Sequence, residues 1–179
     1  FDDHVRIKTK QNEGGRYDHV ILACHSDQAL KLLDTPTDAE QSILGSVPYK
    51  ENIAVLHTDI ALLPKRTKAW ASWNYRIPSE AQSSVILTYN MNILQSIDAP
   101  ETLCVTLNQS RTIDTAQKLY EITYAHPVFT AASVEAQKKH NEISGVNRTH
   151  FCGAYWGNGF HEDGVKSALA ACSFFGKEL

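Results

Sequence analysis

The chain has 179 residues, of which 42% are hydrophobic, and its 17 basic and 20 acidic residues give a formal net charge of −3. This composition is typical of a globular domain and excludes extensive disorder. Because no block of like charges occurs, we expect no nucleic-acid-binding surface. The apolar stretches are far shorter than the roughly 20 residues of a membrane-spanning helix, so we expect no transmembrane segment.

The first residues of the chain and its cysteines indicate where the chain comes from and in which cellular compartment it lies. The chain begins with Phe1, without a basic and apolar signal segment, and its single methionine, Met91, lies in mid-chain. We therefore expect a piece cut from a longer protein. The widely spaced cysteines form no C-x-x-C pair, which indicates free thiols and a cytoplasmic location. They are Cys24, Cys104, Cys152 and Cys172.

Residues 1–47 have the pattern of an α/β protein. Alternation over 3–9 predicts a half-exposed strand, and the continuous apolar run 17–23 predicts a strand buried on both faces, as in a parallel sheet. Ser26 follows at once and is expected to cap a helix through residue 33. Thr37 and Glu40 form a capping box for a second short helix that ends at Gly45.

Residues 48–125 have a different pattern, in which strand follows strand with turn residues between them. The expected strands are 53–62, 69–75, 84–94, 103–107 and 119–124. Without intervening helices, such strands form an antiparallel or mixed sheet, which we interpret as an inserted domain. Alternation places Trp73 and Tyr75 on one face of their strand and Trp70 on the other.

Residues 126–179 return to the α/β pattern. We expect a polar helix over 133–143 closed by Gly145, a short buried strand over 148–153, a loop over 154–164 and a last helix over 165–175. Glycines recur at 153, 157 and 159, where backbone amides could approach a ligand at a helix start. This pattern indicates either a cofactor cradle or a plain glycine-rich connection. The acidic pair Glu162 and Asp163 disfavours a phosphate and favours a neutral heterocycle.

Two other arrangements could carry chemistry. His150, Cys152 and His161 are possible zinc ligands, but two of them share one strand and no further ligand pair has a suitable spacing, so no metal site is expected. Cys24 and His25 could be a nucleophile and its base. Neighbours along a strand point to opposite faces, however, so these two side chains should not meet.

Two segments, YDHVILACHSDQALKLL at 17–33 and FCGAYWGNGFHEDGVKSALAACSFF at 151–175, resemble the C-terminal half of flavin-containing amine oxidases and phytoene-desaturase-like oxidoreductases. The resemblance is closest to a bacterial group of predicted NAD/FAD-binding proteins. In the first segment, the matching positions are Asp18, Val20, Ile21, Ala23, Ala29, Leu30, Leu32 and Leu33.

This resemblance implies an α/β fold in which an incomplete FAD-binding domain, residues 1–47 and 126–179, is interrupted by a substrate domain, residues 48–125, with α+β character. FAD would be the cofactor, and the flavin would accept a hydride from a C–N or C–C bond of a small-molecule or lipid-like substrate. The positions that match the flavin-facing motif are Gly153, Ala154, Gly159, Phe160, His161, Glu162, Asp163, Gly164 and Val165.

The chain also departs from that family. Many relatives carry Asp where Ala154 stands, and a Ser-Gly pair where this chain has Ser167 and Ala168. The glycine fingerprint that holds the FAD pyrophosphate is absent from these residues, so we expect the chain alone to bind FAD weakly or not at all.

Catalytic residues are unassigned. His126, Tyr155 and Trp156 are candidates to face the flavin or substrate only because they lie near the motif. The alternative function is a non-catalytic ligand-binding or protein-interaction module, in which the glycine loop is structural and the aromatic residues form a binding surface.

Overall fold

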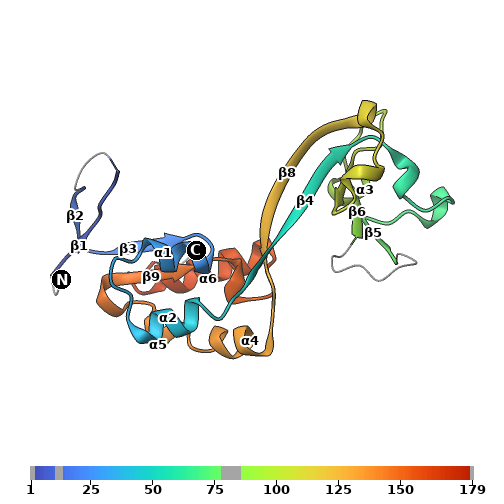
Figure 1. Cartoon of the computed structure of the whole chain (residues 1–179). Helices are drawn as coiled ribbons and strands as arrows, with labels where there is room; N and C mark the ends of the chain where they lie inside the picture. Colours follow the sequence, from blue (N-terminus) through green and yellow to red (C-terminus); the bar gives the residue numbers. More distant parts are fainter. Residues whose placement is uncertain (1–2, 11–13, 78–85, 178–179) are drawn as a thin grey trace. The chain divides into compact units, whose positions relative to one another are not determined.

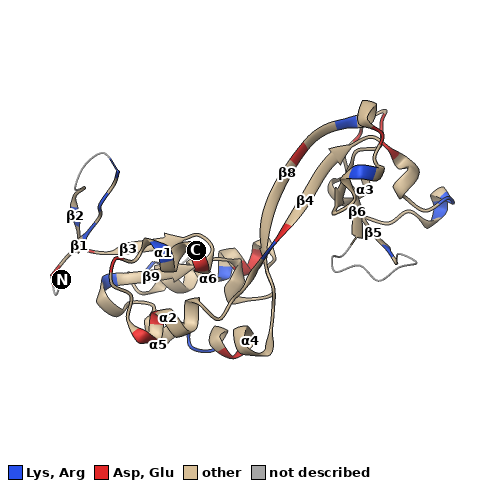
Figure 2. Ribbon diagram, viewed as in Figure 1, with Lys and Arg blue, Asp and Glu red and all other residues tan. Residues whose placement is uncertain are grey.

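The computed structural model describes residues 3–10, 14–77 and 86–177 and divides the chain into two compact units (Figure 1). The discontinuous unit comprises Phe1–Tyr49 and Pro127–Leu179, and the sheet unit comprises Lys50–His126. Helices and strands are mixed along the chain, as in the α/β class. Acidic and basic residues are interspersed in both units (Figure 2).

The first segment of the discontinuous unit contains short strands and two helices. They are β1 (Val5–Arg6), β2 (Arg16–Tyr17), β3 (Val20–Ala23), α1 (Ser26–Leu32) and α2 (Asp38–Leu44). β1 and β2 pair antiparallel, with Val5 opposite Tyr17. The strand expected over 3–9 is therefore reduced to two residues, because β2 offers no longer partner.

Local capping explains where these two helices begin. At α2, the Glu40 amide donates to Thr37 Oγ1 at 3.2 Å and the Thr37 amide donates to Glu40 Oε2 at 2.7 Å, which confirms the capping box. At α1 the expected cap is wrong, since His25 occupies the N-cap and Ser26 is the first helical residue. The Ser26 amide instead donates to the hydroxyl of Tyr49 at 2.9 Å.

The second segment contains α4 (Ala131–Gln137), α5 (His140–Ile143), β9 (Thr149–Cys152) and α6 (His161–Ser173). The single helix expected over 133–143 is two helices, because the Lys139 amide donates to the Ala136 carbonyl, three residues back, and this tighter turn ends α4. α6 begins at His161 rather than at residue 165, so the acidic pair lies inside its first turn.

A parallel pairing of β3 with β9 joins the two segments, with Val20 opposite Thr149 and Ala23 opposite Cys152. α5 and α6 pack against β9, whose four residues are all buried. β3 is not buried on both faces as expected: Ile21 is 44% exposed. β9 is its only partner among the described strands, so part of β3 stays uncovered. The core consists of Ala29, Ile43, Leu44, Val47, Ala136, Ile143, Phe151 and Tyr155.

The sheet unit is built on five strands in the order β5–β6–β7–β4–β8. The strands are β4 (Tyr49–His57), β5 (Trp73–Arg76), β6 (Ile86–Asn90), β7 (Cys104–Leu107) and β8 (Lys118–Pro127), and the short helix α3 (Met91–Gln95) follows β6. The β4–β7, β5–β6 and β6–β7 pairings are antiparallel, in agreement with the expected antiparallel or mixed sheet.

Side-chain caps shorten two of the expected strands, and a third begins later than expected. β4 ends at His57, and the Asp59 carboxylate then accepts from the Ala61 amide to start a 3₁₀ turn. β6 ends where the Asn90 side chain accepts from the Ile93 amide and starts α3. Trp70 precedes β5, so the alternation argument for its face is wrong; its indole donates to the Pro64 carbonyl at 2.8 Å. Residues 84 and 85 of the expected strand lie outside the described residues.

A polar ladder runs across the buried face of the sheet unit. His57 Nε2 lies 2.8 Å from Thr106 Oγ1, which lies 2.9 Å from Thr88 Oγ1. His57 and Thr106 are 0% exposed and Thr88 is 2% exposed. Burial lowers the pKa of His57, so the ladder contains a neutral imidazole. Thr106 is the central member, because both of the others bond to it.

Replacement of Thr106 by Val should therefore destabilise the sheet unit by about 1–3 kcal/mol, because His57 and Thr88 would each lose a buried hydrogen-bond partner. Urea unfolding followed by circular dichroism measures the loss. Thr112→Val makes the same change at an exposed hydroxyl and should have little effect. Equal stability of the two variants would contradict this account of the ladder.

Candidate functional site

The candidate site is the segment 153–164, here called the glycine loop, which links the end of β9 to the first turn of α6. Gly153 begins it, and a Cβ there would lie 2.6 Å from a ring carbon of Tyr155, so a side chain cannot fit. A 3₁₀ turn, Ala154–Trp156, follows. The Ala154 carbonyl then accepts from the amides of Gly157 and Gly159, each at 3.1 Å, which folds the loop back on itself.

Asp163 closes the glycine loop from the helix side. Its Oδ2 accepts from the amides of Asn158 and Phe160, each at 3.0 Å. The carboxylate is therefore bonded to loop amides, and its negative charge is partly offset by their dipoles. The sequence predicted that Asp163 disfavours a phosphate and, through the resemblance, that it belongs to the flavin-facing motif, but it did not indicate these bonds to loop amides.

Two further side chains hold the loop. Gln137 of α4 donates through Nε2 to the carbonyls of Tyr155 at 2.9 Å and Gly157 at 2.6 Å. Ser167 of α6 is buried; its Oγ accepts from the Gly153 amide and donates to the Gly164 carbonyl, both at 2.8 Å. Sequence reasoning did not identify Gln137, because nothing local marks a residue whose partners lie in another segment.

The structure places all nine motif residues on this one continuous stretch. Five of them are exposed: Gly159, Phe160, His161, Glu162 and Val165. The others are half-buried: Gly153, Ala154, Asp163 and Gly164. Gly159 has a φ of 87°, which favours glycine. The outer surface of the loop is therefore open.

The first turn of α6 gives the site a partial positive charge. The amides of Asp163 and Gly164 donate to the Phe160 carbonyl at 3.0 and 3.3 Å. The two preceding amides, of His161 and Glu162, have no carbonyl partner within the helix, because helix geometry provides none. They give this end of α6 a partial positive charge, which attracts an electron-rich group.

Gly164 leaves space at the same place. The atom nearest to a Cβ built on it is the Ala154 amide nitrogen, at 4.0 Å, so the position is open on this side. By contrast, Gly153 and Gly157 are required by close packing, since a Cβ on Gly157 would lie 2.4 Å from the Asp163 carboxylate. Gly164 is thus the loop glycine that packing within the chain does not explain.

The other candidate residues have structural surroundings of their own. Tyr155 is 3% exposed and belongs to the core, which corrects its interpretation as a ligand-facing residue. Burial raises the pKa of its hydroxyl. Trp156 packs edge-on against His140, with ring centroids 4.4 Å apart. His126 lies in the sheet unit, where its Nδ1 is 3.0 Å from the Asn52 side chain.

The possible nucleophile and metal ligands also have structural partners. The His25 ring stacks on Tyr49 with centroids 4.6 Å apart, and burial raises the pKa of the Cys24 thiol, which disfavours the reactive thiolate. His150 Nε2 lies 3.2 Å from His19 Nδ1, while His161 is exposed on α6. Within residues 3–10, 14–77 and 86–177, no group of three or more His, Cys, Asp or Glu side chains is arranged to hold a metal ion.

A cavity of the discontinuous unit lies elsewhere. Its volume is about 800 Å³, and its lining includes Val20 and Thr149, the residues at which β3 and β9 begin. The glycine loop follows the opposite ends of these strands. This cavity therefore makes no contribution to the candidate site.

Neither the family models nor the curated proteins include a match to this chain. The described part of the chain contains no helix with the length and apolarity required to cross a membrane. Assignment of the site therefore depends on its own geometry and on the motif.

Gln137→Met should release the glycine loop, because the Tyr155 and Gly157 carbonyls would lose their donor. We expect a loss of about 1 kcal/mol or more in unfolding free energy and faster hydrogen exchange of the loop amides. Gln41→Met is the matched control, since Gln41 donates to a single carbonyl, that of Pro36, in an exposed setting. Unchanged exchange in the loop would contradict this role of Gln137.

The buried His150 should make stability depend on pH. Burial, followed by the nearby His19 and His140, lowers its pKa below the ordinary 6.5. Between the lowered pKa and 6.5 the unfolded chain binds more protons than the folded one, so the unfolding free energy falls as the pH falls through this range. Urea titrations at pH 7.5 and about 5.5 should show this loss, and His150→Gln should show a smaller one. An identical loss in both proteins would contradict the assignment.

Proposed function

We propose that this chain is the C-terminal part of an FAD-dependent oxidoreductase similar to flavin-containing amine oxidases, in which the discontinuous unit contributes to the FAD-binding domain and the glycine loop faces the flavin. The observation that carries the proposal is the open Gly164 beside the unpartnered amides at the start of α6. The sheet unit would be the substrate domain.

The glycine at position 164 supports a ligand rather than a plain connection. Within a helix, glycine costs about 1 kcal/mol relative to alanine, so a helical glycine without a packing reason is unfavourable. Gly164 has no such reason in this chain, since its Cβ site has no heavy atom closer than 4.0 Å. Close approach of a ligand to the backbone is the remaining physical reason for it.

The residues present also fit a flavin. The amides of His161 and Glu162 would face the edge of the ring system and stabilise negative charge that develops there. Asp163 is compatible with this role because its carboxylate is bonded to the Asn158 and Phe160 amides. When bound, a flavin accepts a hydride from a C–N or C–C bond of the substrate. Gln137 and Ser167 would act as positioning residues that hold the loop in shape.

Two finer points belong to the same proposal. The substrate would be a small or lipid-like molecule, as the resemblance to flavin-containing amine oxidases implies. A cytoplasmic location is supported by the four cysteines, all of which are free thiols.

Gly164→Ala separates a ligand-binding glycine from a structural one. In the 179-residue chain without flavin, the variant should be more stable by about 0.5–1 kcal/mol in urea unfolding, because alanine favours the helix and has room. In the natural gene product that contains this chain, the same variant should weaken the flavin absorption spectrum and the affinity for added FAD. Ser173→Ala, at the far end of α6, is the control and should leave the flavin spectrum unchanged.

A natural gene product that is colourless and takes up no FAD would overturn the proposal. The function would then be a non-catalytic ligand-binding or protein-interaction module. If Gly164→Ala left the flavin spectrum intact, the protein would still be a flavoprotein, but this loop would not be its flavin site.

A further inference from the structure

The glycine loop contains the one Asn-Gly pair of the sequence, Asn158 and Gly159. An asparagine that precedes a glycine is chemically reactive, because the backbone nitrogen of the glycine can attack the side-chain amide carbon of the asparagine. Glycine has no side chain that would obstruct this attack. The local geometry of the loop therefore determines how fast the pair reacts.

The side chain of Asn158 is available for this reaction. It is exposed, and its amide group has no hydrogen-bond partner among the described residues. By contrast, the side chains of Asn74, Asn90 and Asn92 each accept a hydrogen bond from a backbone amide. The Asn158 amide group is thus free to turn toward the backbone.

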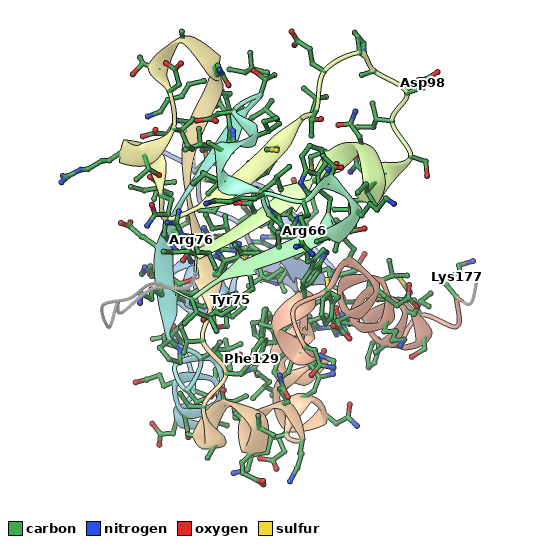
Figure 3. The ribbon with its side chains drawn as sticks, turned by 90° about the vertical axis from the view of Figure 1, so that its right-hand side faces the viewer. Arg66, Tyr75, Arg76, Asp98, Phe129 and Lys177 are labelled. Atoms are coloured by element: carbon green, nitrogen blue, oxygen red, sulfur yellow. The ribbon has the colours of Figure 1, made fainter. Side chains whose placement is uncertain are left out.

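The backbone of the pair is held by hydrogen bonds and by packing. The Asn158 amide donates to Asp163 Oδ2 at 3.0 Å, and the Gly159 amide donates to the Ala154 carbonyl at 3.1 Å. A Cβ built on Gly159 would lie 3.4 Å from the ring of Phe129, which Figure 3 labels. Because the attacking atom is the Gly159 nitrogen, its bond to Ala154 must break before it can react.

Opening of the loop is restrained by a residue outside it. Gln137 Nε2 donates to the carbonyls of Tyr155 at 2.9 Å and Gly157 at 2.6 Å, and Gly157 directly precedes Asn158. These bonds hold the chain on the near side of the Asn-Gly pair. The reaction therefore requires the minority of molecules in which the loop has opened locally.

We propose that Asn158 is a deamidation site and that local opening of the glycine loop controls the rate of its modification. The Gly159 nitrogen loses its proton and bonds to the side-chain carbon of Asn158, ammonia leaves, and a cyclic imide forms. Water then opens the imide at one of its two carbonyls, which gives aspartate or isoaspartate. Oxidation states do not change, and water is the only co-reactant.

The modified loop would not return to its present shape. Either product places a negative charge beside the carboxylate of Asp163, to which the backbone amide of Asn158 is bonded, and like charges at this range repel. Isoaspartate also lengthens the backbone by one methylene between residues 158 and 159. The modification depends on the loop alone and not on a bound flavin.

Incubation of the 179-residue chain at mildly alkaline pH, followed by peptide mass spectrometry, tests the proposal. Asn158 should become a mixture of aspartate and isoaspartate faster than any other asparagine among the described residues. Gln137→Met should speed this conversion about fivefold or more, because the loss of a hydrogen bond worth about 1 kcal/mol raises the open fraction by that factor. Gln41→Met is the matched control and should leave the rate unchanged.

Two further measurements separate loop opening from other causes. In concentrated urea, where the loop is unfolded, the natural chain and Gln137→Met should react at the same rate, faster than either does when folded. Asn158→Gln should abolish the product, because glutamine would have to form a larger ring. Circular dichroism confirms that each variant is folded before incubation.

Three results would overturn the proposal. A folded chain in which Asn158 stays intact while the chain in urea is converted would show that the position is not a modification site. Equal rates for the folded natural chain and Gln137→Met would reject control by loop opening. Faster conversion of another asparagine would assign the modification elsewhere. None of these measurements uses flavin, so a failure here is distinct from a failure of the FAD proposal.

Discussion

The pairing of β3 with β9 is the interaction on which the rest of the structure depends. It joins the first and last segments of the chain in parallel, with Val20 opposite Thr149, so that both segments belong to one unit while Lys50–His126 form the other. The loop-closure entropy of such a distant pairing is offset by buried contacts, above all those of the fully buried Phe151. The same pairing sets the end of β9, and therefore where the glycine loop begins.

From that point, three side chains determine the shape of the candidate site. Asp163 accepts hydrogen bonds from loop amides and so links them to α6. Ser167 links Gly153 to Gly164. Gln137, which lies on α4, donates to two carbonyls of the loop. Each of these bonds joins the loop to a helix and so restrains the loop. A rigid loop of this kind suits a preorganised ligand site, where donors are in place before the ligand arrives.

The sheet unit buries several polar side chains. Its buried face combines apolar residues such as Val55 and Ile86 with a polar ladder. The ladder tolerates burial because the His57, Thr106 and Thr88 side chains bond to one another. This arrangement leaves the apolar residues of the same strands, such as Trp73 and Tyr75, on the side that the unit does not cover.

The sequence by itself determined the features that depend on neighbouring residues. The structure contains three features that follow from local spacing and propensity: the capping box of Thr37 and Glu40, a short buried strand within the expected 148–153, and the strand-rich middle of the chain. The N-cap of α1 was predicted wrongly: His25 occupies it instead of Ser26, because either residue can occupy that position.

Only the tertiary structure decided the features that depend on distant partners. No local pattern indicates that Gln137 will meet Tyr155 and Gly157, that Tyr155 will be buried, or which face of the sheet will be covered. Alternation divides a strand into two faces but does not say which one is buried, and in this sheet the covered face includes His57, Thr88 and Thr106. The physical reason is that burial is a property of the assembled chain, set by segments that meet only after folding.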